Sequence, residues 1–250
     1  MAQTVLFHVS DIHFGIEDRA ALGWFEEAVE AEQPDAVICT GDITQRAKHR
    51  EYAAASEWFA GLGVPVMLEV GNHDMPYYSP VERFRTPFRR YQGLASAIAS
   101  RPAFPGLGFV SLLTTVSAQK RWPWSDGVIR QDALERALAD LRKLDASGQY
   151  KIVTCHHPLV GRRLGGKNPT IGGDAAFAAL AQAGADAVMS GHIHQPFDIT
   201  HDVAGRKVRM IGAGTLSNRL RGAAPSFNVL RFDPGTGLAV ECYEFPDSKA

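Results

Sequence analysis

The sequence predicts an α/β protein, because short apolar runs alternate along the chain with longer segments whose apolar residues recur about every 3.6 positions. The composition fits a globular fold, since 45% of the 250 residues are hydrophobic and 21% are charged. A chain of this length can fold as one α/β domain. We therefore expect a single domain over residues 1–250.

Five short apolar runs are predicted to be buried strands, and they lie at residues 5–9, 36–39, 66–70, 152–155 and 187–189. Two segments between them have helical periodicity. The residues that share a helical face are Leu22, Phe25 and Val29 in the first segment and Leu134, Leu138 and Leu141 in the second. Pro34 is predicted to end the first helix.

The remaining segments are predicted from their turn and breaker residues. The stretch at about residues 75–105 is rich in Pro and Arg and is interpreted as an insertion or cap within the domain. After Ser190 the pattern changes to strands joined by tight turns. The predicted hairpins are 197–201 with 208–211 around Ala204-Gly205, and 227–232 with 238–245 around Pro234-Gly235.

The nearly balanced charge argues against a long nucleic-acid partner. Lys and Arg total 26 against 27 Asp and Glu, for a formal net charge of −1, so no overall positive field attracts a phosphate backbone. Cys39, Cys155 and Cys242 are far apart and form no CxxC pair, which excludes a disulfide scaffold and a cysteine zinc site. We expect all three to be small buried apolar residues.

The N-terminal segment has no basic region followed by a long apolar stretch, and no run in the chain approaches 18 apolar residues. We therefore expect a cytoplasmic protein with no membrane partner.

Polar clusters follow all five predicted strands. They are Ser10-Asp11-Ile12-His13, Thr40-Gly41-Asp42, Gly71-Asn72-His73-Asp74, His156-His157-Pro158 and Gly191-His192-Ile193-His194. Ligands of α/β proteins bind at the carboxyl ends of the strands, so we expect these clusters to converge on one site. Any one cluster alone is an ordinary turn, but five in order after five strands favour a functional site.

The side-chain types in these clusters predict a centre of two metal ions. Imidazole, carboxylate and amide ligands without thiolate suit divalent ions, with Mn or Fe favoured and Zn, Co or Ni also compatible. Two such ions carry four positive charges, whereas Asp11, Asp42 and a bridging hydroxide supply three negative ones. About one positive charge is left at the site, so an anionic substrate is expected.

Together the clusters resemble the full motif set of the calcineurin-like metallophosphoesterases, and they span about three quarters of the chain. The segments Gly-Asp-Ile-Thr-Gln and His-His-Pro are most similar to the bacterial branch that contains class III cyclic-nucleotide phosphodiesterases. The resemblance implies a four-layer α/β/β/α sandwich of two mixed sheets flanked by helices. It also implies hydrolysis of a phosphate ester by attack of a metal-bridging hydroxide.

The resemblance further implies a role for each site residue. One metal would be held by Asp11, His13, Asp42 and His194, and the other by Asp42, Asn72, His156 and His192. His73 would protonate or stabilise the leaving oxygen, and Asp74 would orient the His73 ring. His156 and His157 are adjacent, and the family's His-x-Pro pattern favours His156 as the ligand. The glycine often found soon after the second Asp is missing here, which affects only local loop contacts.

The expected substrate is a small phosphate ester. The family branch implies that nucleotides are among the candidates and that diesters are favoured over monoesters. The alternatives are a phosphomonoesterase or protein phosphatase, and a non-catalytic scaffold, which would be expected to lose ligands. Some charged side chains could clamp a phosphate or nucleotide or could belong to solvated loops: Arg162, Arg163, Lys167, Arg219 and Arg221. Trp122 and Trp124 could stack on a base or could belong to core or lid packing. The histidines outside the motifs are interpreted as strand or surface residues: His8, His49 and His201.

Overall fold

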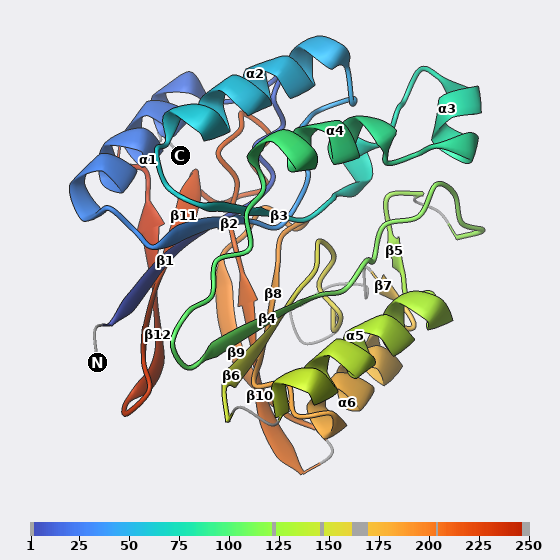
Figure 1. The fold of residues 1–250 in the computed structure, drawn as a ribbon. Helices are drawn as coiled ribbons and strands as arrows, with labels where there is room; N and C mark the ends of the chain where they lie inside the picture. Colours follow the sequence, from blue (N-terminus) through green and yellow to red (C-terminus); the bar gives the residue numbers. More distant parts are fainter. Residues whose placement is uncertain (1–2, 122–123, 146–147, 162–169, 204, 247–250) are drawn as a thin grey trace.

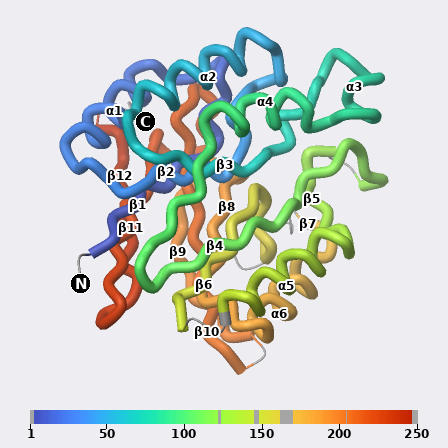
Figure 2. Tube along the Cα trace, viewed as in Figure 1, coloured from blue at the N-terminus to red at the C-terminus, as the bar shows by residue number. Residues whose placement is uncertain are grey.

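The protein is described here by a computed structural model that covers residues 3–121, 124–145, 148–161, 170–203 and 205–246. Two five-stranded sheets lie between two layers of helices (Figure 1). Strands from the two ends of the chain lie side by side in the first sheet, as the blue and red traces in Figure 2 show.

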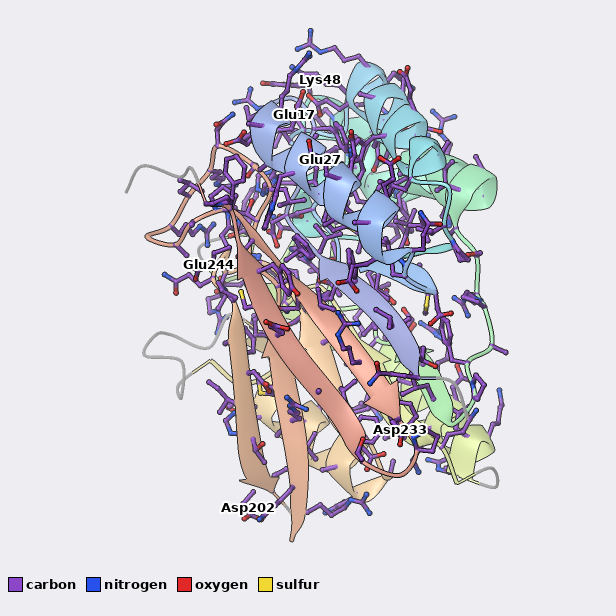
Figure 3. All side chains as sticks on the ribbon, turned by 90° about the vertical axis from the view of Figure 1, so that its left-hand side faces the viewer. Glu17, Glu27, Lys48, Asp202, Asp233 and Glu244 are labelled. Carbon is purple, nitrogen blue, oxygen red and sulfur yellow. The ribbon has the colours of Figure 1, made fainter. Side chains whose placement is uncertain are left out.

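The first sheet has the strand order β12-β11-β1-β2-β3. Its strands β1, β2 and β3 run parallel, and the hairpin β11–β12 adds two antiparallel strands beside β1. The bounds are Thr4–Val9 for β1, Ala36–Cys39 for β2, Val66–Leu68 for β3, Ser226–Asp233 for β11 and Gly237–Glu244 for β12. Figure 3 shows this hairpin from the side, with Asp233 labelled at the end of β11 and Glu244 at the end of β12.

The second sheet has the order β4-β6-β8-β10-β9, in which β9 alone runs antiparallel to its neighbour. The bounds are Leu107–Ser111 for β4, Tyr150–Thr154 for β6, Ala187–Ser190 for β8, Phe197–Val203 for β9 and Arg206–Gly212 for β10. A separate parallel pair joins β5 (Gly127–Val128) to β7 (Thr170–Ile171).

Helices cover the outer face of each sheet (Figure 1). The first sheet packs against α1, α2 and α4, and the second packs against α5 and α6. The short helix α3 projects beyond the first helical layer in Figure 1. The helix bounds are Arg19–Glu32 for α1, His49–Gly61 for α2, Pro80–Arg85 for α3, Arg89–Ile98 for α4, Gln131–Asp145 for α5 and Gly173–Gln182 for α6.

Side chains alternate between the two faces of each sheet, as the two-residue period of a strand requires. On β1, Phe7 packs under the helices and Leu6 packs between the sheets. On β8, Val188 packs under the opposite helices, and Met189 lies in the same buried cluster as Leu6. The two sheets therefore pack face to face, which confirms the α/β sandwich of two mixed sheets flanked by helices.

Several predicted elements are confirmed in detail. Helix α1 ends at Glu32, and Gln33 takes a left-handed backbone (φ 45°) just before Pro34. Both predicted hairpins are present, as β9–β10 and β11–β12. The third strand ends at Leu68, earlier than expected. The sequence periodicity did not single out β4, α2 or α6.

The segment interpreted as an insertion or cap contains the two helices α3 and α4. Helix α4 packs into the first helical layer, where Leu94 is buried in the core cluster. No residue of α3 is buried. Its Val81 and Phe84, one helical turn apart, are both exposed.

The expectation that all three cysteines are buried is wrong for one of them. Cys39 and Cys155 are buried, whereas Cys242 is exposed on β12, the edge strand of the first sheet. His8 and His201 are buried strand residues, and His49 is an exposed residue at the start of α2. Within the described ranges no helix has both the length and the apolar character needed to span a bilayer.

Candidate metal centre

The seven side chains proposed as metal ligands come together at the carboxyl ends of five strands drawn from both sheets. They are Asp11 and His13 after β1, Asp42 after β2, Asn72 after β3, His156 after β6, and His192 and His194 after β8. The carboxylates and imidazoles among them are buried, with exposed fractions of 8% or less. The site is therefore a closed cluster of polar groups between the two sheets.

The first group of donor atoms surrounds Asp11. Its Oδ1 lies 3.1 Å from Nε2 of His194, and that Nε2 lies 3.3 Å from Nε2 of His13. His13 Nε2 is also 3.9 Å from Oδ2 of Asp42. These four side chains thus point their donor atoms at a common space.

The second group surrounds His156. Its Nε2 lies 3.2 Å from Oδ1 of Asn72 and 3.3 Å from Oδ1 of Asp42. A ring nitrogen of His192 lies within 4.8 Å of one of His156. Because Oδ2 of Asp42 faces the first group and Oδ1 faces the second, this carboxylate lies between them as a bridging ligand would.

Backbone carbonyls fix two of the imidazoles in the form that leaves Nε2 free to bind a metal. Nδ1 of His156 donates to the carbonyl of Thr40 at 2.8 Å, and Nδ1 of His194 donates to the carbonyl of Arg219 at 2.6 Å. A carbonyl only accepts, so Nδ1 carries the proton in each neutral ring. Such outer hydrogen bonds are typical of metal-ligating histidines.

Unpaired acceptors show that the donor set fits a cation. Oδ1 of Asp11 is buried without an assigned hydrogen-bond partner, and it lies 3.1 Å from Nε2 of His194. A bound cation would give this oxygen and the neighbouring ring nitrogens a common partner. The surrounding nitrogen and oxygen donors match the preferences of borderline and hard divalent ions.

The electrostatics of the cluster are dominated by Asp42 and His156. Burial alone would raise the pKa of Asp42, but the neighbouring imidazoles of His156 and His73 hold it well below its usual range. Burial would lower the pKa of His156, but the charge and hydrogen bond of Asp42 raise it to about 9. The charge of Asp42 therefore favours the protonated form of His156, and a metal ion would compete with that proton for Nε2.

Most of the ligands have an unusual backbone conformation. Positive φ angles are found at Asp11 (54°), His13 (52°), Asp42 (51°), His192 (71°) and His194 (59°). Only two other described non-glycine residues, Gln33 and Ala47, share this left-handed backbone. Strained backbone of this kind, at about 1–3 kcal/mol per residue, persists where the surrounding structure enforces it and is concentrated at functional sites.

Two motif glycines allow the ligand loops to approach one another. A Cβ on Gly71 would lie 2.1 Å from the backbone nitrogen of Asp42. A Cβ on Gly191 would lie 1.8 Å from Oγ of Ser10. Any side chain at either position would push the neighbouring loop, and with it a ligand, out of place.

The proposed role of Asp74 is wrong in one respect, because Asp74 does not orient the ring of His73. The ring donates through Nδ1 to the carbonyl of Gln45 at 2.7 Å. The Asp74 carboxylate instead accepts hydrogen bonds from backbone N–H groups of Ile43, Thr44 and Gly71 and from the Thr44 hydroxyl. The 3₁₀ turn Asn72–Asp74 directs consecutive side chains to different sides, so Asp74 ties two ligand loops together.

His157 is engaged elsewhere, although it is adjacent to His156. Its Nε2 donates to the carbonyl of Ser125 at 2.8 Å, and its Nδ1 lies 2.9 Å from the hydroxyl of Thr114. Burial, followed by the charge of His156, lowers the pKa of His157 to about 3. Both ring nitrogens are therefore satisfied, which favours His156 as the ligand.

Substituting the two adjacent histidines should separate stability from metal binding. His157→Gln is expected to lower the free energy of unfolding by about 1–3 kcal/mol, because buried hydrogen bonds are lost, and to keep its metal content. His156→Gln is expected to lose metal. Urea unfolding and metal analysis of both variants provide the measurements. Loss of metal from His157→Gln alone would reverse the assignment.

Two of the arginines singled out in the sequence face the centre. Nη1 of Arg219 lies 2.9 Å from Nε2 of His73, and Nη1 of Arg221 donates to the carbonyl of His192 at 3.3 Å. Trp124 is exposed, so it does not belong to the core. Trp122, Arg162, Arg163 and Lys167 lie outside the described residues.

A family model described as calcineurin-like phosphoesterase matches residues 4–196, which include every side chain of the cluster. The chain belongs to this family. Membership indicates a hydrolase that acts on phosphate esters and implies a dinuclear metal centre. The two donor groups that share Asp42 are the part of this phosphoesterase that fits such a centre.

A curated relative of this phosphoesterase is named glycerophosphodiester phosphodiesterase GpdQ, from Enterobacter lignolyticus (strain SCF1). The two are 32% identical over 81 residues, which is 28% of this chain and 29% of the relative. The match thus spans less than a third of the relative's length.

Solved structures of low sequence identity share the fold of this phosphoesterase. A dimetal phosphatase from Danio rerio is 13% identical, with a TM-score of 0.64 over 97% of this chain and 99% of its own. Purple acid phosphatase PPD1 from yellow lupin (Lupinus luteus) is 13% identical, with a TM-score of 0.70 over 99% of this chain and 52% of its own. GAP50, described as the anchor in the inner membrane complex of Plasmodium, is 12% identical, with a TM-score of 0.61 over 100% of this chain and 87% of its own.

Proposed function

We propose that this protein is a phosphodiesterase that hydrolyses small phosphate diesters with two divalent metal ions. The observation that carries the proposal is the position of Asp42, whose two carboxylate oxygens face two separate groups of donor atoms. A carboxylate shared by two ions is the arrangement that clamps the attacking and leaving oxygens of a displacement at phosphorus.

Each side chain of the cluster has a role in this proposal. One ion would be held by Asp11, His13, Asp42 and His194, and the other by Asp42, Asn72, His156 and His192. When bound, the ions would supply Lewis acidity to the phosphoryl oxygens and lower the pKa of a water molecule. We expect Mn or Fe, with Zn, Co and Ni as alternatives.

His73 would serve as the proton donor or acceptor for the leaving oxygen. Its ring lies 4.8 Å from that of His13, so it borders the first donor group. Its Nδ1 is engaged by the carbonyl of Gln45, which leaves Nε2 as the atom that exchanges a proton with the ester.

The name of the bacterial relative supports diesters over monoesters, because it is a phosphodiesterase. Exposed aromatic side chains support a substrate with a flat group such as a nucleobase. Tyr77 and Tyr78 are 66% and 60% exposed and follow the His73 loop, and Trp124 adjoins Ser125, the partner of His157. Such rings can stack on a base.

A substrate panel tests this function. The protein should be stripped with a chelator, reloaded with Mn²⁺, and assayed on bis(p-nitrophenyl) phosphate, p-nitrophenyl phosphate, cyclic AMP, 2′,3′-cyclic nucleotides and glycerophosphodiesters. We expect activity to disappear on metal removal, to return on reloading, and to show the highest kcat/KM for a diester. A higher kcat/KM for the monoester would favour a phosphomonoesterase or protein phosphatase. No turnover of any ester with both ions bound would favour a scaffold.

A further inference from the structure

The side chain of Arg219 contacts His73 beside the candidate metal centre. The contact joins Nη1 of Arg219 to Nε2 of His73 at 2.9 Å. Since Nδ1 of His73 donates to the carbonyl of Gln45, its Nε2 is the acceptor and the guanidinium is the donor. A permanently charged guanidinium therefore contacts the ring nitrogen that the proposed reaction uses.

Arg219 forms no ion pair with a carboxylate among the residues that the structure describes. Other partly buried arginines do form such pairs, as Arg90 does with Glu82 and Arg209 with Asp198. A guanidinium prefers an anionic acceptor with two oxygens, because the charge strengthens each hydrogen bond and the planar fork matches the oxygen spacing. The imidazole of His73 satisfies neither preference.

Hydrogen bonds hold the backbone of Arg219 beside the metal centre, so its side chain starts from a defined position. Its carbonyl accepts the hydrogen bond from Nδ1 of His194, and its N–H donates to Oγ of Ser217 at 3.3 Å. Thr215 in the same loop donates through its hydroxyl to the carbonyl of Asp11 at 2.6 Å. The loop that carries the charge is thus joined to ligands of the first donor group.

We propose that Arg219 binds the phosphate of the substrate directly. Its guanidinium exchanges the Nε2 acceptor of His73 for a non-bridging oxygen of the ester, which is a stronger acceptor because it is anionic. The exchange leaves Nε2 of His73 free to face the leaving oxygen. Arg219 therefore determines affinity for the phosphoryl group, and this inference rests on the proposed action on phosphate esters.

Arg221 offers a matched control in the same loop. It carries the same charge and lies two positions further along the chain, but its Nη1 donates to the backbone carbonyl of His192. Removing either charge changes the overall field of the site to a similar degree. Only the loss of Arg219 should remove a direct phosphate contact.

The experiment measures binding of inorganic phosphate to the Mn-loaded protein by calorimetry, with metal content checked for every variant. We expect Arg219→Gln to weaken the Kd by about 10–100-fold, as expected for a hydrogen bond to a charged group of about 1.5–3 kcal/mol. The Kd of Arg219→Lys should lie between those of the wild type and Arg219→Gln, because lysine keeps the positive charge but lacks the planar fork of the guanidinium. Arg221→Gln should stay within about threefold of the wild type.

A double variant separates direct binding from an effect through His73. If Arg219 binds phosphate itself, Arg219→Gln should weaken the Kd at least as much in a His73→Ala background as in the wild type, because no hydrogen bond to His73 is given up there. The proposal is overturned if the loss vanishes in that background, if Arg221→Gln loses as much, or if the metal-loaded wild type binds no phosphate. Phosphate binding without turnover of any ester would instead count against the proposed function.

Discussion

Asp42→Asn is expected to lose both metal ions and to lower kcat/KM by more than about 100-fold. The variant keeps an oxygen that can accept the hydrogen bond from the N–H of His73, which Asp42 Oδ1 accepts at 2.8 Å. It removes the negative charge and the oxygen that faces the first donor group, so the two groups no longer share a carboxylate. Partners in the outer shell of metal sites alone are worth about 10–100-fold, so a bridging ligand should be worth more.

Asp11→Asn is the matched control, because Oδ1 of Asp11 faces the imidazoles of His13 and His194 in the first donor group. It should lower the occupancy of one ion and leave the second donor group intact. Metal analysis after dialysis against a fixed concentration of free Mn²⁺ gives the number of ions per chain. Two ions retained by Asp42→Asn would exclude the bridging role.

His73→Ala is expected to keep both metal ions and to lose kcat by about 10²–10⁴-fold, the usual contribution of general acid–base catalysis. The loss should be largest for an alkoxide leaving group such as a ribose hydroxyl. It should shrink for p-nitrophenolate, a weak base that needs little protonation. Comparing kcat for the two leaving groups tests the assignment.

Asn72→Ala provides the contrast on the same turn. The Oδ1 of Asn72 lies beside Nε2 of His156, so this variant should bind metal more weakly and recover part of its rate in excess Mn²⁺. His73→Ala should recover nothing. Equal losses for both leaving groups in His73→Ala would mean that His73 stabilises the phosphoryl charge and donates no proton.

The metal-ligand residues could be predicted from the sequence because they are recognised by their side-chain types and by their positions after strands. Each ligand follows an apolar strand, and parallel strands bring their carboxyl ends to one edge. The partners that orient those ligands carry no such signal, since the carbonyls of Thr40, Gln45 and Arg219 belong to any residue type. The error over Asp74 has the same origin, because its hydrogen bonds go mainly to backbone groups.

The fold could be predicted only as far as the local periodicity of the sequence reports on it. The alternation of strands and helices predicted the α/β class, and Pro34 marked the end of α1. The pairing of β1 with β11 could not be derived from either strand alone, because it joins residues such as His8 and Asn228 at opposite ends of the chain. The four-layer arrangement was expected from family resemblance, which supplied that long-range information.

The pairing of β1 with β11 also sets the order of events during synthesis. The first sheet needs residues 226–233 beside β1, and the carbonyl of Asp11 is bound by the hydroxyl of Thr215, 204 positions later. At about 5–20 residues per second, this interval lasts roughly 10–40 s on the ribosome. One edge of an apolar strand stays unpaired for that time, and the contact of Asp11 with Thr215 forms only after residue 215 has been made. The first donor group can therefore be completed only after His194 and Thr215 have been synthesised.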